Sequence, residues 1–127
     1  MVGEPIPQAA PPTLTTVPGA CAAEMYWVRA AWVGQNGEEG CPSEPGVLSA
    51  PEGTVPMAEA GEAPAIASGW NVYAGTSIDA TRLQNSTPIP IGSSWTMPPT
   101  GLAAGRIAGQ GQSPSSYRRI EQVVRRG

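Results

Sequence analysis

The stretch Tyr26-Trp27-Val28-Arg29-Ala30-Ala31-Trp32-Val33, followed by Gly34-Gln35-Asn36-Gly37-Glu38-Glu39-Gly40, decides the fold of this chain. Aromatic and β-branched residues favour an extended strand, and a polar segment with glycine after such a strand is typical of a β-hairpin turn. Side chains in a strand alternate between two faces. The face that carries Arg29 is the less apolar one. We therefore expect the opposite face to join the core, with the residues Tyr26, Val28, Ala30 and Trp32.

Two apolar residues, Trp27 and Val33, share the face of Arg29. Apolar side chains on an otherwise solvated face indicate contact with another surface. That surface belongs either to another protein or to a loop or arm of the same chain, and the sequence leaves both alternatives open. We predict Trp27 and Val33 as protein-interface residues.

The composition fits one small β domain with extended ends. The chain has 127 residues, of which 16 are Gly and 15 are Pro. This Gly and Pro content is near the level at which disorder begins. However, 40% of the residues are apolar, four are Trp, and the net charge is only −3, so a core can form without strong self-repulsion.

The residue types that are missing argue against an enzyme. The chain has no His, and all seven basic residues are Arg. Histidine is the most frequent general base near neutral pH and the commonest metal ligand. The glutamates cluster in expected loops without a visible nucleophile or the alternating spacing of a calcium loop, so we interpret them as solvated charges. We expect no catalytic residue, no metal and no cofactor.

The remaining strands are expected between residues 21 and 99. Residues 1–20 contain five prolines after Glu4 and predict an extended Pro-rich arm. Further strands are predicted around 47–48, 53–57, 70–73 and 95–97, and an edge strand at 83–91, where two prolines cannot donate to a ladder. Short strands separated by turn signals predict a small antiparallel β-sandwich at 21–99. Residues 100–112 are predicted to be a Gly-rich linker.

The last segment, 113–127, has a different character. Ser113 precedes Pro114 in the arrangement of a helix start, and three apolar residues then fall on one helical stripe: Tyr117, Ile120 and Val124. Four arginines lie here, namely Arg118, Arg119, Arg125 and Arg126. We predict a short amphipathic helix of net charge +3. Three alternatives stay open: a solvated tail, docking on a protein, or contact with phosphate, for which the nucleic-acid signal is weak.

The two cysteines, Cys21 and Cys41, are too few for a zinc site. If the hairpin turns near Asn36-Gly37, they are about 35–40 Å apart along an extended strand, whereas a disulfide needs Cα atoms within about 7 Å. Free thiols are expected, and an intermolecular disulfide between neighbouring copies is the alternative. The first residues have no signal-peptide pattern and no stretch suits a membrane span, so synthesis in a cytoplasm without membrane contact is expected.

The residues also carry a resemblance to a known family. Tyr26-x-Val28-Arg29-x-x-Trp32-Val33 with Gly37-Glu38-x-Gly40-x-Pro42-Ser43-Glu44 resembles the last hairpin of a fibronectin type III domain. Gly69-Trp70-Asn71-Val72-Tyr73-Ala74-Gly75-Thr76 resembles the central strand of that fold and the turn after it. In an ordinary domain the central strand precedes the hairpin, whereas here it follows. This order is similar to that of domains in virion proteins of tailed bacteriophages, over roughly residues 12–102.

The resemblance implies an all-β, fibronectin- or Ig-like sandwich and a structural role. Our first hypothesis is a structural accessory protein, in a decoration, collar, neck or tail position, of a virion that is assembled in the bacterial cytoplasm. The expected partners are other virion structural proteins in a multi-copy symmetric assembly, without membrane and without nucleic acid, and both termini are expected to dock on these neighbours. The alternative is an adhesion module for host glycan or envelope protein, in which Trp27, Tyr73 or Trp95 stacks on a sugar.

Overall fold

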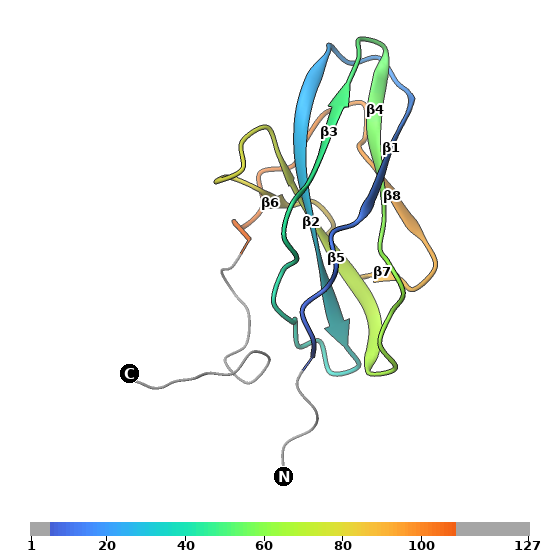
Figure 1. The fold of residues 1–127 in the computed structure, drawn as a ribbon, viewed down its shortest axis with the longest axis vertical. Coiled ribbons are helices and arrows are strands. Elements are labelled where there is room, and N and C mark those ends of the chain that lie inside the picture. Colours follow the sequence, from blue (N-terminus) through green and yellow to red (C-terminus); the bar gives the residue numbers. More distant parts are fainter. Residues whose placement is uncertain (1–5, 109–127) are drawn as a thin grey trace.

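Strand β2 (Glu24–Gly34) is the centre of the fold, as its aromatic and β-branched sequence predicts. It pairs antiparallel with β3 (Gly46–Ala50) on one side and with β5 (Ala67–Gly75) on the other. The computed structural model describes residues 6–108. Within that range the chain is all-β, with antiparallel pairing and no helix (Figure 1).

The strands form two sheets that face each other (Figure 1). One sheet has the order β1-β4-β8 and the other the order β3-β2-β5-β6, with β7 also pairing with β5. The bounds of the strands not yet given are Thr13–Pro18 for β1, Thr54–Glu59 for β4, Arg82–Leu83 for β6, Ile89–Pro90 for β7 and Ser94–Thr96 for β8. The expected strands near 47–48, 53–57, 70–73 and 95–97 are therefore confirmed.

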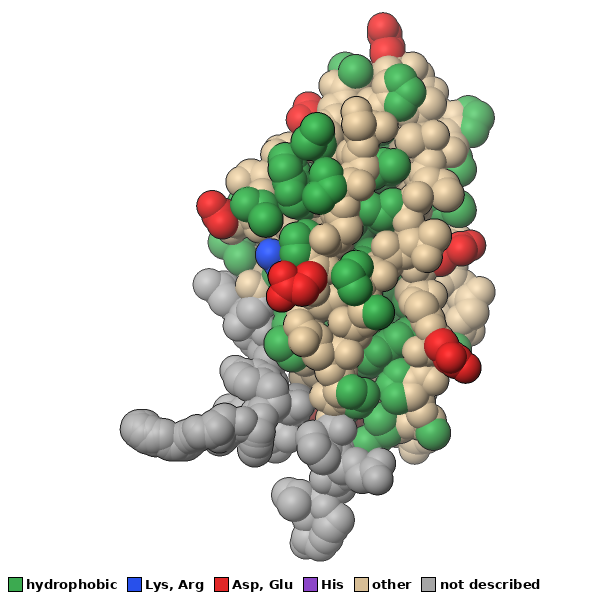
Figure 2. Space-filling view, viewed as in Figure 1, with side chains coloured by type: hydrophobic (Ala, Val, Ile, Leu, Met, Phe, Trp, Pro, Cys, Tyr) green, Lys and Arg blue, Asp and Glu red, His purple; other side chains and the backbone are tan. Residues whose placement is uncertain are grey.

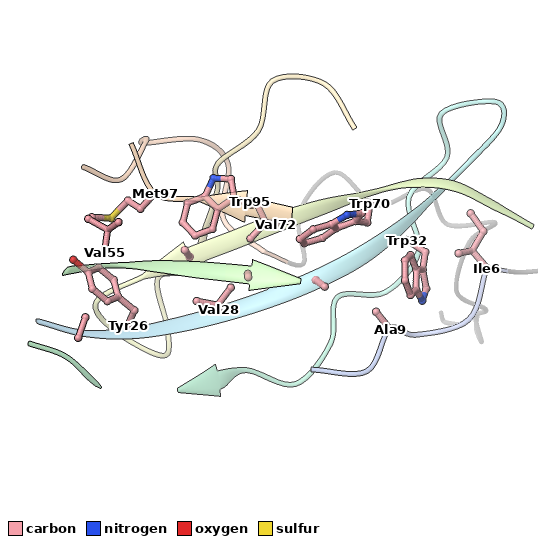
Figure 3. Close-up of a cluster of buried hydrophobic side chains, with 14 residues drawn as sticks. Ile6, Ala9, Tyr26, Val28, Trp32, Val55, Trp70, Val72, Trp95 and Met97 are labelled. Atoms are coloured by element: carbon pink, nitrogen blue, oxygen red, sulfur yellow. The ribbon is translucent and has the colours of Figure 1, made fainter. Parts of the chain in front are cut away.

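The core lies between the two sheets, and the predicted inward face of β2 is confirmed. Tyr26, Val28, Ala30 and Trp32 are all buried. On the same face of this sheet they lie beside Trp70 and Val72 of β5, and across the core they meet side chains of the smaller sheet, among them Val55 and Trp95 (Figure 3). Burial of this apolar surface contributes about 25 cal/mol per Å² removed from water, and it is the main favourable term for a domain of this size.

The hairpin turn also lies where the sequence predicts it. Gly37 has φ 86°, a left-handed conformation that glycine adopts without strain, and its N–H donates to the carbonyl of Gly34 at 3.0 Å. After the turn, the N–H of Gly40 bonds to Trp32 and that of Ser43 to Ala30, so the returning chain stays beside β2 until β3 begins.

The predicted N-terminal arm at 1–20 is wrong for its described part. Residues 13–18 form β1, which pairs with β4 over six residues, and Ile6 and Ala9 are buried in the core. Prolines are compatible with this strand because β1 is at the edge of its sheet, where one side of the backbone needs no ladder partner. The N-terminal segment therefore completes the domain itself.

Two predictions for the second half of the chain also need correction. The expected edge strand at 83–91 is divided into β6 and β7, and Pro88, which cannot donate to a ladder, lies in the segment between them. The predicted linker at 100–112 is wrong up to Ala108, since Leu83 N–H bonds to the Arg106 carbonyl at 2.8 Å and Ala108 N–H to Thr81 at 2.9 Å. We call residues 102–108 the strap. The predicted helix at 113–127 lies outside the described residues.

No helix in the part of the chain that the structure describes is long and apolar enough to cross a membrane.

Candidate functional site

The candidate site is the outer face of the β3-β2-β5-β6 sheet, which points away from the core. Alternation along β2 places Trp27, Arg29, Ala31 and Val33 on this face. The register sets Arg29 opposite Tyr73, Ala31 opposite Asn71, and Val33 opposite Gly69. The two ends of this face differ: a buried polar network covers the end near the hairpin turn, and apolar side chains are exposed at the other end.

Glu39 is the centre of the buried network. It follows the hairpin turn, forms an isolated bridge with Val33, and is only 4% exposed. Its Oε2 accepts hydrogen bonds from the hydroxyl of Tyr73 at 2.5 Å and from Nδ2 of Asn71 at 2.8 Å. Its Oε1 accepts from Nη2 of Arg106 at 2.8 Å, which is also an ion pair. Such pairing compensates the high cost of burying a carboxylate.

The network continues through Asn85. Its Nδ2 donates to Oδ1 of Asn71 at 2.8 Å, and its Oδ1 accepts from the backbone N–H of Val72 at 2.9 Å. The hairpin turn, β5, the segment after β6 and the strap are thereby joined. A hollow of about 300 Å³ borders these side chains. Both oxygens of the Glu39 carboxylate accept hydrogen bonds from other side chains of this chain. We therefore interpret the network as a structural element that stabilises the fold.

The electrostatics of the network follow from burial and from the Glu39 charge. Burial raises the pKa of Tyr73, and the hydrogen bond and negative charge of Glu39 raise it further. Burial lowers the pKa of Arg106, but its hydrogen bond to Glu39 and the charges of Tyr73 and Glu39 outweigh this, so that the pKa is raised overall. Tyr73 therefore stays a hydrogen-bond donor, and Arg106 stays charged, well above neutral pH.

At the opposite end of the face, apolar side chains are exposed to solvent. Met25 is 44% exposed, Val47 is 54% exposed, and Trp27 between them is half-buried. Trp27 lies directly opposite Val47 in the β2–β3 register. We call Met25, Trp27 and Val47 the apolar strip. Figure 2 shows hydrophobic side chains gathered at the upper left, between the β2–β3 hairpin and the β5–β6 loop.

A hollow of about 370 Å³ is lined by Arg29, the next outward residue of β2 after Trp27 of the apolar strip. The guanidinium of Arg29 donates from Nη1 to the carbonyl of Ser43 at 3.0 Å, which holds it against the hairpin. The rim includes the exposed acidic residues Glu44 and Asp79 and the exposed Ile78, and the end of the strap closes it with Ile107 and Ala108. We call this cavity the Arg29 hollow.

Cys41 also lines the Arg29 hollow. It is a free thiol, as is Cys21, so no intrachain bridge joins the two. Burial raises the pKa of Cys41, the negative charge of Glu44 adds to the rise, and Arg29 opposes it. A raised pKa keeps the thiol protonated and weakly nucleophilic. An intermolecular disulfide through Cys21 or Cys41 stays a prediction.

The structure separates the predicted interface residues. Trp27 lies on the outer face and is partly accessible, whereas Val33 is only 3% exposed. The interface prediction for Val33 is therefore wrong, because elements of the same chain cover this end of the face. Among the predicted sugar-stacking residues, Tyr73 is fully buried and Trp95 is 8% exposed, so neither is available. The other predicted interface residues lie outside the described residues: Tyr117, Arg118, Arg119, Ile120, Val124, Arg125 and Arg126.

The Glu39 network was not predicted from the sequence. The prediction that Glu39 is a solvated loop charge is wrong, because this side chain is buried. A signal was present in β5, where Asn71 and Tyr73 alternate with the core residues Trp70 and Val72 and so place polar atoms on the outer face. The Arg106 partner is 67 residues away from Glu39 and could not be inferred from spacing.

Within residues 6–108, no group of three or more His, Cys, Asp or Glu side chains is placed to hold a metal ion. Comparison of the chain with protein-family models, with curated proteins and with solved structures finds no match.

Proposed function

We propose that this chain is a structural accessory protein of a tailed-phage virion, in a decoration, collar, neck or tail position. Its body would be a fibronectin type III- or Ig-like sandwich that acts by burying surface against neighbouring virion proteins. The observation that carries the proposal is the strand order β3-β2-β5-β6 in the larger sheet.

That order supports the family resemblance strand by strand. In immunoglobulin-type sandwiches the closing hairpin F–G lies beside strand C, and variable-type domains add C′ beyond it. The β2–β3 hairpin takes the place of F–G, β5 that of C, and β6 that of C′. The opposite sheet, β1-β4-β8, takes the place of A, B and E. The hairpin precedes the central strand in this chain, which is the order that the phage-protein resemblance carries.

The exposed surface suits attachment to proteins. The apolar strip and the rim of the Arg29 hollow combine apolar side chains with the acidic residues Glu44 and Asp79. Many copies on one particle would add avidity to a weak individual contact. Because residues 6–18 belong to the domain, the docking role falls to this outer face and to the C-terminal segment 113–127.

The proposal is tested by incorporation into particles. A chain that lacks residues 113–127 is expected to keep the cooperative thermal unfolding of the domain but to be absent from purified virions. The substitution Trp27→Ala is expected to lower occupancy as well. Its control is Glu62→Ala, at an exposed residue that lines a different cavity. Normal occupancy of both the deletion and Trp27→Ala would contradict the docking role.

The second candidate function is adhesion to host glycan or envelope protein. One observation supports adhesion: the half-buried indole of Trp27 lies beside the exposed Val47. The face of such an indole can stack on a sugar. A glycan array and a cell-binding assay on the isolated chain discriminate the two functions. Binding that is lost in Trp27→Ala would favour adhesion, whereas no binding favours the structural role.

A further inference from the structure

The apolar strip and the Arg29 hollow form one continuous surface with an unusual share of the exposed apolar groups. Four large apolar side chains are exposed among residues 6–108, namely Met25, Val47, Ile78 and Ile91. The first two belong to the apolar strip, and Ile78 lines the hollow. Trp27 and Arg29 join the two regions, since they are successive outward residues of β2. Exposed apolar surface rimmed by polar groups marks an interaction site.

The charges on this surface are mostly negative. Glu24, Glu44 and Asp79 are exposed around it, while the guanidinium of Arg29 is engaged with the Ser43 carbonyl. Residues 6–108 contain eight acidic residues against three arginines, a net charge of −5. In Figure 2, acidic side chains border the hydrophobic cluster at the upper left. The fitting occupant is a segment that is both apolar and basic.

The chain itself carries such a segment next to this surface. Ala108 lines the Arg29 hollow, and its N–H is bonded to Thr81 at 2.9 Å, so the described part of the chain ends at this hollow. The segment 113–127 has a net charge of +3 and the apolar stripe Tyr117, Ile120 and Val124. The five residues 109–113 span up to about 17 Å when extended, enough to return across the hollow.

We propose that the outer face of β2 and β3 is a docking site for the C-terminal segment of the same chain. Tyr117, Ile120 and Val124 pack on the apolar strip, and the arginines of the segment pair with Glu24, Glu44 and Asp79. A short amphipathic helix is marginal in water alone, so the contact and the helix form together. A short tether provides an effective concentration of about 1 mM, and even a contact with a Kd of about 0.1 mM would then leave about ten docked molecules for each open one.

Hydrogen–deuterium exchange of the full chain, analysed by mass spectrometry, tests this site. Amides of residues 117–126 are expected to exchange about tenfold more slowly than in a free peptide of the same sequence, in line with that ratio. Dilution of the protein is expected to leave this protection unchanged. The double substitution Glu44→Arg and Asp79→Arg is expected to remove it, and so is Trp27→Ala.

The matched control is Glu59→Arg with Glu62→Arg, which reverses two exposed charges that line a different cavity, beside Trp32 and Trp70. This variant is expected to keep the protection. Reversal of Arg118, Arg119, Arg125 and Arg126 to Glu removes the protection in the original chain and restores it in the Glu44→Arg, Asp79→Arg background. The variants in this comparison differ only in charge. A loss of folding in one of them would not restore the protection in another.

Three results would overturn the proposal: free-peptide exchange in the original chain, protection that survives reversal of Glu44 and Asp79, or protection that falls on dilution. Protection that falls on dilution would show that the segment docks on a second copy of the chain instead. All these measurements use the isolated chain, whereas in a particle a neighbouring virion protein would compete with the segment for the same face, so failure of one proposal is distinguishable from failure of the other.

Discussion

Glu39 shows how one buried charge can organise a surface of this domain. A carboxylate that is 4% exposed carries a large desolvation cost, which the hydrogen bonds from Tyr73, Asn71 and Arg106 offset. Such a group contributes little net stability while its partners are present, but the loss of a partner is costly because the charge stays buried. The consequences can be measured one residue at a time.

Tyr73→Phe is expected to lower the free energy of unfolding by about 1–2 kcal/mol near pH 8, because Glu39 loses a donor inside the protein. The Tyr73 pKa is raised in the folded state above the ordinary value of 10.0. Its stabilising effect is therefore full below pH 10 and is lost as the pH rises through and beyond that value. Urea unfolding at pH 8, 10 and 11 should show a shrinking difference between the two proteins. A constant difference across this range would contradict the assignment.

Cys41 is expected to react slowly with iodoacetamide at pH 7 and to gain reactivity as the pH rises above 9, because its pKa is raised by burial and by Glu44. A Cys21→Ala background isolates its rate. Glu44→Gln removes one cause of the raised pKa and is expected to accelerate the reaction at pH 8. Glu62→Gln neutralises an exposed glutamate outside the Arg29 hollow and should leave the rate unchanged. A rate insensitive to Glu44→Gln would contradict the electrostatic part of this explanation.

Residue patterns predicted some of the site and missed the rest for physical reasons. Period-two alternation correctly placed Trp27 on the outer face, since that property is local to one strand. It could not show that Val33 is covered, because the cover comes from segments distant in sequence. The burial of Glu39 depends on Arg106 and on the path of the strap, which no local pattern contains.

At the scale of elements, the strap is the feature that most closely links distant parts of the chain. Gln84 bonds to Ala103 through both its Nε2 and its Oε1, at 3.0 and 2.7 Å, and Arg82 donates from Nη1 to the Gly105 carbonyl at 3.1 Å. Together with the Arg106–Glu39 ion pair, these contacts fix an irregular segment along β6. The strap covers one edge of the sheet and so limits unwanted pairing with other chains.

Arg106→Ala is expected to lower the free energy of unfolding by about 1–2 kcal/mol. The ion pair joins a 40% exposed arginine to a buried glutamate, so solvent screening reduces the effect from the roughly 3–5 kcal/mol of fully buried pairs. In a double-mutant cycle with Glu39→Gln, the two effects should not add, with a coupling of about 1 kcal/mol. Arg82→Ala, which removes a strap bond without a buried charge, is the control and should cost less. Strict additivity would show that the pair is not coupled.

Gly75→Ala is expected to destabilise the domain by about 1–3 kcal/mol, because an added Cβ would lie 2.3 Å from the carbonyl oxygen of Ala80, a backbone atom. The β5–β6 turn would have to move. Gly61→Ala is the matched control, since nothing lies within 4 Å of its Cβ position and its φ is not positive. The test is thermal unfolding of both variants. Equal midpoints would contradict the close approach.

Element predictions succeeded where the signal is local. The β2–β3 hairpin and β4, β5 and β8 follow from alternation, aromatic content and turn residues. The strand β1 was missed because its surroundings are rich in proline, which weighs against a strand except at a sheet edge, and edge position is a tertiary property. The strap was missed because Gly and Ala carry little pattern, although Gly105 lies so close to Leu83 that a Cβ would meet its carbonyl at 2.3 Å.

At the scale of the whole molecule, the strands of one sheet come from both ends of the described chain. The β1-β4-β8 sheet needs residues 13–18 and residues 94–96, and the β2–β3 hairpin inserted between β1 and β4 belongs to the other sheet. In turn, β4 lies in the sequence between β3 and β5 of the larger sheet, so the strands of the two sheets alternate along the chain. We therefore expect the two layers to unfold together, as one cooperative unit.

The strap also gives the molecule a mechanical property. A pull on the chain beyond Ala108 would load the strap bonds one after another, starting at Thr81, before tension reached the core strands. Released from β6, residues 102–108 would lengthen the protein by up to about 24 Å while the sheets stay packed. Single-molecule stretching should show this step at low force, and Arg106→Ala should lower that force further. If the whole domain instead unfolds in a single step, the strap does not extend separately from the sheets. In a virion, an extensible strap would let the domain take up a pull on its C-terminal end without unfolding.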